Sequence, residues 1–178
     1  MNPHIFQLNT SPGGVPKLPI PEAAVAADGM SGDRQRDLRH HGGPERALCL
    51  YSLEKIAELQ REGHPIHPGS TGENVTISGM SWEDIRPGVQ LELGEALVEV
   101  TSFTAPCRNI AGSFMEEGFT RISQKLHPGD SRVYARVVRG GTLRAGDPVR
   151  IVGNPPGHMP GPPGSMRRTI SARGSATD

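Results

Sequence analysis

Glycines and prolines interrupt the apolar runs of this chain at short intervals, and this spacing limits what the chain can fold into. The 178 residues include 23 glycines and 17 prolines, some near the C-terminus and the rest spread between short hydrophobic runs. Frequent turns of this kind leave room for short elements only, which is typical of β-rich proteins. We therefore expect a mostly β (α+β) fold with a few short helices.

Runs with the composition of strands recur along most of the chain. They cover residues 4–9, 47–51, 71–77, 89–93, 96–103, 131–139 and 148–152. The clearest helix is residues 52–62, because Ser52 is a natural N-cap and Gly63 follows the last apolar position. A chain of this length can bury one core, so we expect one domain over residues 1–152. Residues 153–178 are rich in proline and glycine, which predicts a disordered tail.

Charge and cysteine content narrow the classes of function. Lys plus Arg and Asp plus Glu both number 19, so no net field favours binding to nucleic acid or to a membrane surface. Aromatic residues make up only 4% of the chain, which also disfavours the stacking of bases. Two cysteines in different settings form no disulfide framework, and neither a signal peptide nor a membrane-spanning run is visible. We expect a soluble cytoplasmic protein.

The stretch 104–110 carries the strongest chemical signal. It follows a predicted strand and contains Pro106, which cannot donate to a β-ladder. Cys107 comes next, and the adjacent Arg108 favours the thiolate, which is the form that acts as nucleophile and metal ligand. A lone cysteine is more often a small buried hydrophobe. That description fits Cys49, which lies within an apolar run, so we take Cys107 as the candidate and Cys49 as core.

A polar stretch over residues 29–44 alternates charges between glycines. The glycines indicate close approaches that a Cβ would block. Arg34 and Arg36 supply planar donors that suit a phosphate or a carboxylate, although an exposed charged loop is an equally good interpretation. His40 and His41 are neighbours, and no second pair follows at the spacing of a zinc site. We expect one of them to donate a hydrogen bond in a site or to cap a turn.

Gly72-Glu73-Asn74 begins another predicted strand. A carboxylate and an amide at the mouth of a strand could orient a neighbouring histidine or arginine. The spacing alone favours a simpler interpretation, in which the tripeptide is a turn with two exposed polar side chains.

Several of these pieces, taken in order, resemble the MOSC domain family, a domain found at the C-terminus of molybdenum cofactor sulfurases and also as small stand-alone proteins. The pieces are Lys17-Leu18-Pro19, Gly32-Asp33 leading to His41-Gly42-Gly43, Gly72-Glu73-Asn74, Pro106-Cys107, and Arg132 with Tyr134 two residues later. The resemblance covers about residues 4–152. It implies a barrel-like, mostly β domain with a pocket in which a cysteine meets molybdenum cofactor chemistry.

The resemblance also implies roles for individual residues. Cys107 matches the cysteine that is proposed in the family to carry persulfide sulfur or, in the reductase branch, to ligate molybdenum. His41, Glu73 and Asn74 match other recurring motifs and would shape the site. The remaining positions that we expect to hold the cofactor, several of them cations suited to its phosphate, are Lys17, Asp33, Arg34, Arg36, Gly42, Gly43, Gly72, Thr104 and Arg108.

Three functions remain open at this point. The first is a molybdenum-cofactor-binding or sulfur-carrier protein, supplied with sulfur by a partner such as a cysteine desulfurase. The second is the catalytic subunit of a small molybdenum reductase of N-hydroxylated compounds, which would need a partner protein as electron donor. The third is a non-enzymatic barrel that binds a small anion or a protein. Pyridoxal phosphate is not expected, because the aminotransferase-like domain of the larger sulfurases does not fit in 178 residues.

Overall fold

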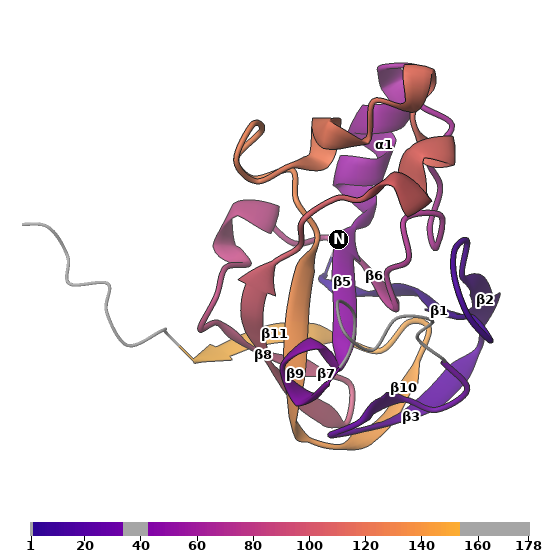
Figure 1. Cartoon of the computed structure of the whole chain (residues 1–178). Helices are drawn as coiled ribbons and strands as arrows, with labels where there is room; N and C mark the ends of the chain where they lie inside the picture. The colour runs from indigo at the N-terminus through magenta and orange to yellow at the C-terminus, as the bar shows by residue number, and fades with distance from the viewer. Residues whose placement is uncertain (1, 34–42, 154–178) are drawn as a thin grey trace, which may run out of the picture.

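The computed structural model describes residues 2–33 and 43–153, and Figure 1 shows their arrangement. Residues 34–42 of the predicted polar stretch 29–44, and residues 154–178 of the predicted tail 153–178, lie outside these ranges. The described part contains eleven strands, one α-helix and five short 3-10 helices. The expectation of a mostly β protein with few helices is confirmed.

Eight of the strands form the main sheet. Its order is β11-β7-β8-β9-β5-β6-β1-β2. The bounds are β1 His4–Thr10, β2 Leu18–Ile20, β5 Leu48–Ser52, β6 Val75–Ser78, β7 Gln90–Leu93, β8 Ala96–Phe103, β9 Val133–Arg139 and β11 Val149–Gly153. A smaller sheet has the order β10-β3-β4, with bounds β3 Glu22–Ala26, β4 Gly29–Met30 and β10 Gly141–Arg144.

The predicted helix is confirmed as α1, Leu53–Arg61. Its N-cap is Ser52, whose side chain accepts a hydrogen bond from the N–H of Lys55 and so satisfies one of the free donors of the first turn. The helix connects β5 to β6, which pair in parallel, whereas the other neighbours in the main sheet are antiparallel. A parallel pair needs a crossover of this kind, so α1 fixes the topology at the centre of the sheet.

The short 3-10 helices connect the strands. Their bounds are η1 Pro44–Arg46, η2 Trp82–Asp84, η3 Arg108–Ser113, η4 Met115–Glu117 and η5 Phe119–Ile122. In Figure 1 the helices of residues 108–122 lie beside α1 at one end of the molecule, and β3 and β10 lie at the other end. None of the helices in the described ranges has the length and apolar character needed to cross a lipid bilayer.

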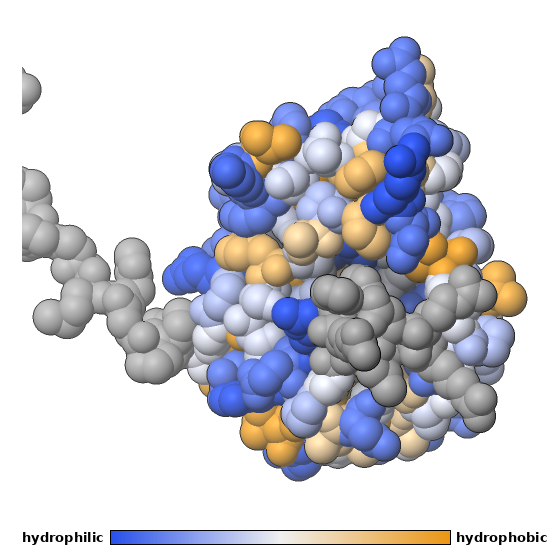
Figure 2. Space-filling model, in the orientation of Figure 1, coloured by the Kyte–Doolittle hydropathy of each residue, from blue (hydrophilic) through white to orange (hydrophobic). Residues whose placement is uncertain are grey.

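One hydrophobic core serves both sheets. It includes Leu91 and Val98 from the β7–β8 hairpin as well as Val25 and Leu143 from the smaller sheet. The exposed large apolar side chains come from distant elements: Phe6, Leu18, Met115, Leu126, Val138, Ile151 and Val152. Figure 2 shows small apolar patches scattered over one face rather than one large patch. Most of the large apolar side chains are therefore buried in a single core.

The expectation of a barrel is wrong, because the main sheet is not closed. Its two edge strands are β11 and β2, and no ladder joins them within the described residues. The two ends of the sheet approach each other at an isolated bridge between His4, in β1, and Pro148. Backbone hydrogen bonds flank this bridge, from the N–H of Ile5 to the carbonyl oxygen of Asp147 at 2.8 Å and from the N–H of Gly146 to that of Ile5 at 2.7 Å. The short strand β2 contains Pro19 and is followed by Pro21, neither of which can donate to a further strand. Prolines therefore end the sheet on this side.

Candidate functional site

Cys107 lies just beyond the end of β8, where the chain leaves the main sheet. The N–H of Thr104 donates to the carbonyl oxygen of Arg132 at 2.9 Å, which ties this exit to the residue before β9. The strand ends before Pro106, and Cys107 has an extended backbone immediately before η3. Its thiol is half-buried and forms no disulfide. The fold thus holds this thiol at a fixed place while leaving part of it accessible.

The other cysteine has the character expected of a core residue. Cys49 lies in β5 and is buried. Burial raises the pKa of its thiol, although the nearby Arg132 acts in the opposite direction. The structure therefore separates an inert buried thiol from an accessible one.

Arg108 does not join the buried residues near Cys107. Its side chain is 83% exposed and forms an ion pair with Glu117, with 3.2 Å between the guanidinium nitrogen and the carboxylate oxygen. The sequence places Arg108 next to the thiol in the chain, but the structure engages its guanidinium at the surface. A buried cation for this region has to come from elsewhere in the fold.

Three of the predicted site residues do meet, and we call Lys17, Asp33 and Asn74 the polar cluster. The Nζ of Lys17 lies 2.5 Å from Oδ2 of Asp33, and Nδ2 of Asn74 donates to the same oxygen at 2.9 Å. The other oxygen of Asp33 accepts from the N–H of Ser11 at 2.9 Å. Oδ1 of Asn74 accepts from the N–H of Cys49 at 3.1 Å. The cluster therefore joins the N-terminal strands to β5 through a nearly buried ion pair.

Glu73 is fully buried and holds its own loop together. One carboxylate oxygen accepts from the N–H of Gly69 at 2.6 Å, and the other accepts from the hydroxyl of Thr71 at 2.8 Å. The hydroxyl of Thr76 donates at 3.3 Å to the same oxygen that accepts from Gly69. The interpretation of Gly72-Glu73-Asn74 as an exposed turn is wrong, because Glu73 and Asn74 are both buried. With its bonds directed to residues 69–76, Glu73 is a structural anchor for the site.

Gly72 is required where the two loops approach each other. Its φ is +85°, and a Cβ at this position would lie 2.8 Å from Cγ1 of Val15. The loop that follows β1 therefore packs directly on the loop that carries Glu73. This close approach brings Lys17 to the same side of the sheet as Asn74.

Arg132 is a buried cation, which the sequence indicates only as part of a family motif. It is 6% exposed, and within the described residues its guanidinium makes one hydrogen bond, from NH1 to the carbonyl oxygen of Thr71. In the same part of the chain its Nε has no hydrogen-bond partner, and neither has the hydroxyl of the buried Thr104. The signal that could have singled it out is its position between Ser131 and Val133 in a run of core residues. A charged side chain at such a position is rarely buried without a reason.

Tyr134 connects Arg132 with both cysteines. It lies opposite Cys49 in the β5–β9 ladder. Burial raises the pKa of Tyr134 to about 12, and the charges that act on it include those of Cys49, Arg132, Arg46 and Cys107. The guanidinium carbon of Arg46 lies 5.5 Å from the centre of its ring. Cys107 and the buried Arg132 therefore both lie close enough to Tyr134 to influence its pKa.

Four of the expected site residues lie outside the described ranges: Arg34, Arg36, His41 and Gly42. Gly43 precedes η1 and has a φ of +83°, a conformation that suits glycine. Within residues 2–33 and 43–153, no group of three or more His, Cys, Asp and Glu side chains is arranged to hold a metal ion.

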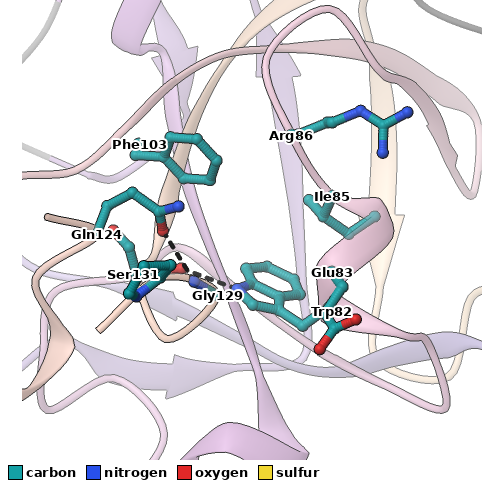
Figure 3. Close-up of a pocket in the computed structure, with 9 residues that line it drawn as sticks. Trp82, Glu83, Ile85, Arg86, Phe103, Gln124, Gly129 and Ser131 are labelled. Atoms are coloured by element: carbon teal, nitrogen blue, oxygen red, sulfur yellow. Dashed lines mark hydrogen bonds between the residues drawn. The ribbon is translucent and has the colours of Figure 1, made fainter. Parts of the chain in front are cut away.

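A cavity of about 330 Å³ lies beside the segment that precedes β9. It is lined by Trp82, Glu83, Ile85, Arg86, Phe103, Gln124, Pro128, Gly129 and Ser131 (Figure 3). The indole N–H of Trp82 donates to the carbonyl oxygen of Ser131 at 2.8 Å, and the N–H of Gly129 donates to Gln124 at 3.2 Å. These bonds shape the wall next to Thr104, but no residue predicted for the site lines the cavity.

Comparison with known proteins identifies the family. The model of the MOSC domain matches residues 37–150, which is well over half of the chain. The chain belongs to the MOSC domain family. The matched span contains Asn74, Cys107 and Arg132, and the first two residues of the polar cluster, Lys17 and Asp33, precede it.

Two curated relatives and a solved structure support this membership. YflK of Bacillus subtilis (strain 168) is 31% identical over 142 residues, covering 78% of this chain and 63% of YflK. YiiM of Escherichia coli (strain K12) is 26% identical over 146 residues, covering 79% of this chain and 64% of YiiM. The crystal structure of YiiM from Geobacillus stearothermophilus superposes with a TM-score of 0.66 at 25% identity, covering 85% of this chain and 75% of that one. The chain spans a little under two thirds of the length of the two curated relatives.

Proposed function

We propose that this MOSC protein is a molybdenum-cofactor-binding or sulfur-carrier protein, and that Cys107 is the residue that holds the metal or the sulfur. One observation carries the proposal. A half-buried free thiol stands at the exit of β8, three residues after Thr104, whose N–H donates to the carbonyl oxygen of the buried Arg132 at 2.9 Å. Within the described residues, Nε of Arg132 has no hydrogen-bond partner. Thiolates are soft ligands and sulfur nucleophiles, so the same side chain suits both roles.

The residues present fit a large anionic cofactor. The unpartnered Nε of Arg132 and hydroxyl of Thr104 are donors to anionic oxygen, and both are buried. When bound, the cofactor would supply redox or sulfur-exchange chemistry at its metal. In this assignment Cys107 would ligate the metal centre and Arg132 would offset negative charge, while the polar cluster holds the loop after β1 in place.

The sulfur-carrier role needs only chemistry that a thiolate and a persulfide donor provide. The Cys107 sulfur would attack the outer sulfur of a donor persulfide, forming a new sulfur–sulfur bond while the donor's own bond breaks. The donor leaves as a thiolate, and no external oxidant is consumed. We propose a cysteine desulfurase as this donor, in a reducing cytoplasm that keeps Cys107 from forming disulfides.

The experiment is elemental and sulfur analysis of protein purified anaerobically from cells that make the cofactor. The wild type would be compared with Cys107→Ser, and Cys49→Ala would serve as the matched control. We expect either about one molybdenum per chain or cyanide-labile sulfur, lost in Cys107→Ser and retained in Cys49→Ala. Neither signal in the wild type would contradict the proposal.

The same material distinguishes the alternative of a reductase. If molybdenum is present, turnover of N-hydroxylated compounds with a reductant or a partner electron-transfer protein would favour a small molybdenum reductase. Molybdenum without turnover would favour a protein that holds the cofactor.

A further inference from the structure

His64 lies just after the end of α1, and its ring contacts the segment that follows η3. The N–H of Met115 donates to Nδ1 of His64 at 3.1 Å. An imidazole nitrogen accepts a hydrogen bond only through its lone pair, so in this contact Nδ1 carries no proton and the ring is neutral. The contact therefore exists in one charge state of His64 and not in the other.

The backbone and the ring of His64 are both held in place. Its N–H donates to the carbonyl oxygen of Leu59 at 3.1 Å, which fixes the residue to the last turn of α1. The ring meets the buried ring of Phe114 edge-on, with 5.3 Å between the two centres, and the side chain of His64 is only 13% exposed. A change in the charge of this ring therefore acts on the bond to Met115.

The segment that His64 binds, η4, has a strained backbone. Glu116 and Glu117 have φ values of +53° and +56°, a left-handed conformation that is unfavourable for residues with a Cβ. The side chain of Met115 packs on Gly63, where a Cβ would lie 2.9 Å from the methionine sulfur. Strain of this kind persists only where surrounding contacts impose it. Loss of the bond to His64 therefore favours relaxation of η4.

A carboxylate faces the other nitrogen of the ring. Oε2 of Glu62 lies 3.7 Å from Nε2 of His64. Arg121 of η5 donates to both oxygens of Glu62, at 2.8 and 2.7 Å, and these hydrogen bonds hold the pKa of Glu62 below its usual value. Glu62 is therefore ionised throughout the range, about pH 5 to 8, in which histidines change charge.

The other charged groups around the ring belong to the elements that pack at this end of the molecule (Figure 1). Arg121 divides its charge between Glu62 and Asp130. Among the described residues, Glu62 is the carboxylate that lies within 4.0 Å of the ring nitrogens. The further charged side chains of α1, η3 and η4 on this side are Lys55, Glu58, Arg61, Arg108, Glu116 and Glu117.

We propose that His64 is a pH-sensitive switch that binds η4 when neutral and releases it when protonated. Once Nδ1 carries a proton, it faces the N–H of Met115 as a second donor and can no longer accept. The protonated ring is stabilised by Glu62, so the released state has a partner for its charge. The switch is independent of the role proposed for Cys107.

Release would change the surroundings of the chain just after Cys107. Glu117 of η4 forms the ion pair with Arg108, the residue that follows this cysteine. The hydroxyl of Ser113 donates to the carbonyl oxygen of Ser70 at 3.0 Å, so η3 keeps a contact of its own. The movement is therefore confined to η4 and to the partner of Arg108.

The experiment follows the amide of Met115 in the full chain by solvent-exchange NMR from about pH 8 to about pH 5. Rates are expressed as protection relative to an unstructured peptide, which removes the intrinsic pH dependence of amide exchange. We expect the protection to fall about tenfold, the effect of one hydrogen bond, in parallel with the titration of the His64 ring protons. An amide that is unprotected at the upper pH, or equally protected at both ends, would overturn the switch.

His64→Asn is the informative variant, because asparagine offers an oxygen near the place of Nδ1 and does not titrate. We expect the protection of Met115 to become independent of pH in this variant. His67→Asn, at an exposed histidine three residues later, is the matched control and should keep the pH dependence of the wild type. A pH dependence that survives in His64→Asn would assign the effect to another group and overturn the proposal.

Glu62→Gln tests the carboxylate that stabilises the protonated ring. We expect the midpoint of the Met115 transition to move to lower pH, because the charged ring loses its partner. Glu58→Gln, at an exposed position in α1, should leave the midpoint unchanged. An unchanged or higher midpoint in Glu62→Gln would contradict the mechanism. Cys107→Ser should keep the transition, which separates the switch from the proposed function.

Discussion

At the scale of single residues, the two cysteines differ in burial, and this difference has a direct chemical consequence. Cys107 is half-buried, whereas burial raises the pKa of Cys49 in β5. Under native conditions we expect one thiol per chain to react with iodoacetamide, and peptide mass mapping should find the label on Cys107. Cys49 should react only after unfolding. Labelling of Cys49 at the same rate as Cys107 in the folded protein would show that β5 opens locally.

The ion pair of the polar cluster is the second residue-scale test. The side chains of Lys17 and Asp33 are only 10% and 5% exposed, so each depends on the other for its charge. Asp33→Asn leaves the ammonium group without its partner and should lower the free energy of unfolding by about 3 kcal/mol in urea titrations. Asp28→Asn, at an exposed position in the turn between β3 and β4, is the control and should change it by less than about 0.5 kcal/mol. Equal effects of the two substitutions would mean that the pair is not buried.

At the scale of secondary-structure elements, Asp130 joins three segments that are distant in the chain. Its carboxylate accepts from Lys55 of α1 at 3.0 Å and from Arg121 of η5, while Arg121 also binds Glu62 just after α1 at 2.7 Å. Burial opposes ionisation of Asp130, but these hydrogen bonds outweigh it and hold its pKa below the usual value. The network fastens the helical end of the molecule to the segment that leads into β9.

The sign of the pH dependence follows from this depressed pKa. Stabilisation by ionised Asp130 is fully present above the pKa of an unfolded aspartate, about 4, and is lost as the pH falls through the lower folded value. We therefore expect the melting temperature of the wild type to exceed that of Asp130→Asn at pH 7 and the gap to narrow below about pH 4. If this difference in melting temperature stayed constant down to pH 2, the ionised carboxylate of Asp130 would not be the source of the stabilisation.

The elements that the sequence predicts well are those with local signals. The hairpin of β7 and β8 turns at Gly94, and α1 starts at its Ser52 cap, as expected from turn and capping residues. The weakly helical stretch after Cys107 became a series of 3-10 helices, because its glycines and a residue with positive φ, Glu116, interrupt longer turns.

The site was less predictable because its contacts are tertiary. The cluster of Lys17, Asp33 and Asn74 was expected only through the family resemblance, since no local pattern requires these side chains to touch. Arg108 looked like the cation of the site from its position beside Cys107, yet Arg132 is the buried one. Neighbours along a chain leave a strand in different directions, so adjacency in sequence is a weak guide to adjacency in space.

At the scale of the whole molecule, the two sheets share one core, and this determines how the protein should unfold. Leu143 of β10 is fully buried in the same cluster as the residues of β7 and β8. Leu143→Ala should lower the free energy of unfolding by about 3 kcal/mol, whereas Val138→Ala, at a position 49% exposed, should change it little. Trp82 fluorescence and far-ultraviolet circular dichroism should report the same transition in both variants. Separate transitions would show that the smaller sheet unfolds independently.

The site draws its side chains from points far apart in the chain. Lys17 lies between β1 and β2, Asn74 directly precedes β6, and Arg132 directly precedes β9, more than one hundred residues after Lys17. Closing loops of this length costs conformational entropy, so chains whose contacts are mostly between distant residues fold slowly. In a nascent or partly folded chain these side chains are not yet close together, so the site is not formed. On the proposed function, a cofactor would bind only to the folded molecule, so loading would be a separate event after synthesis.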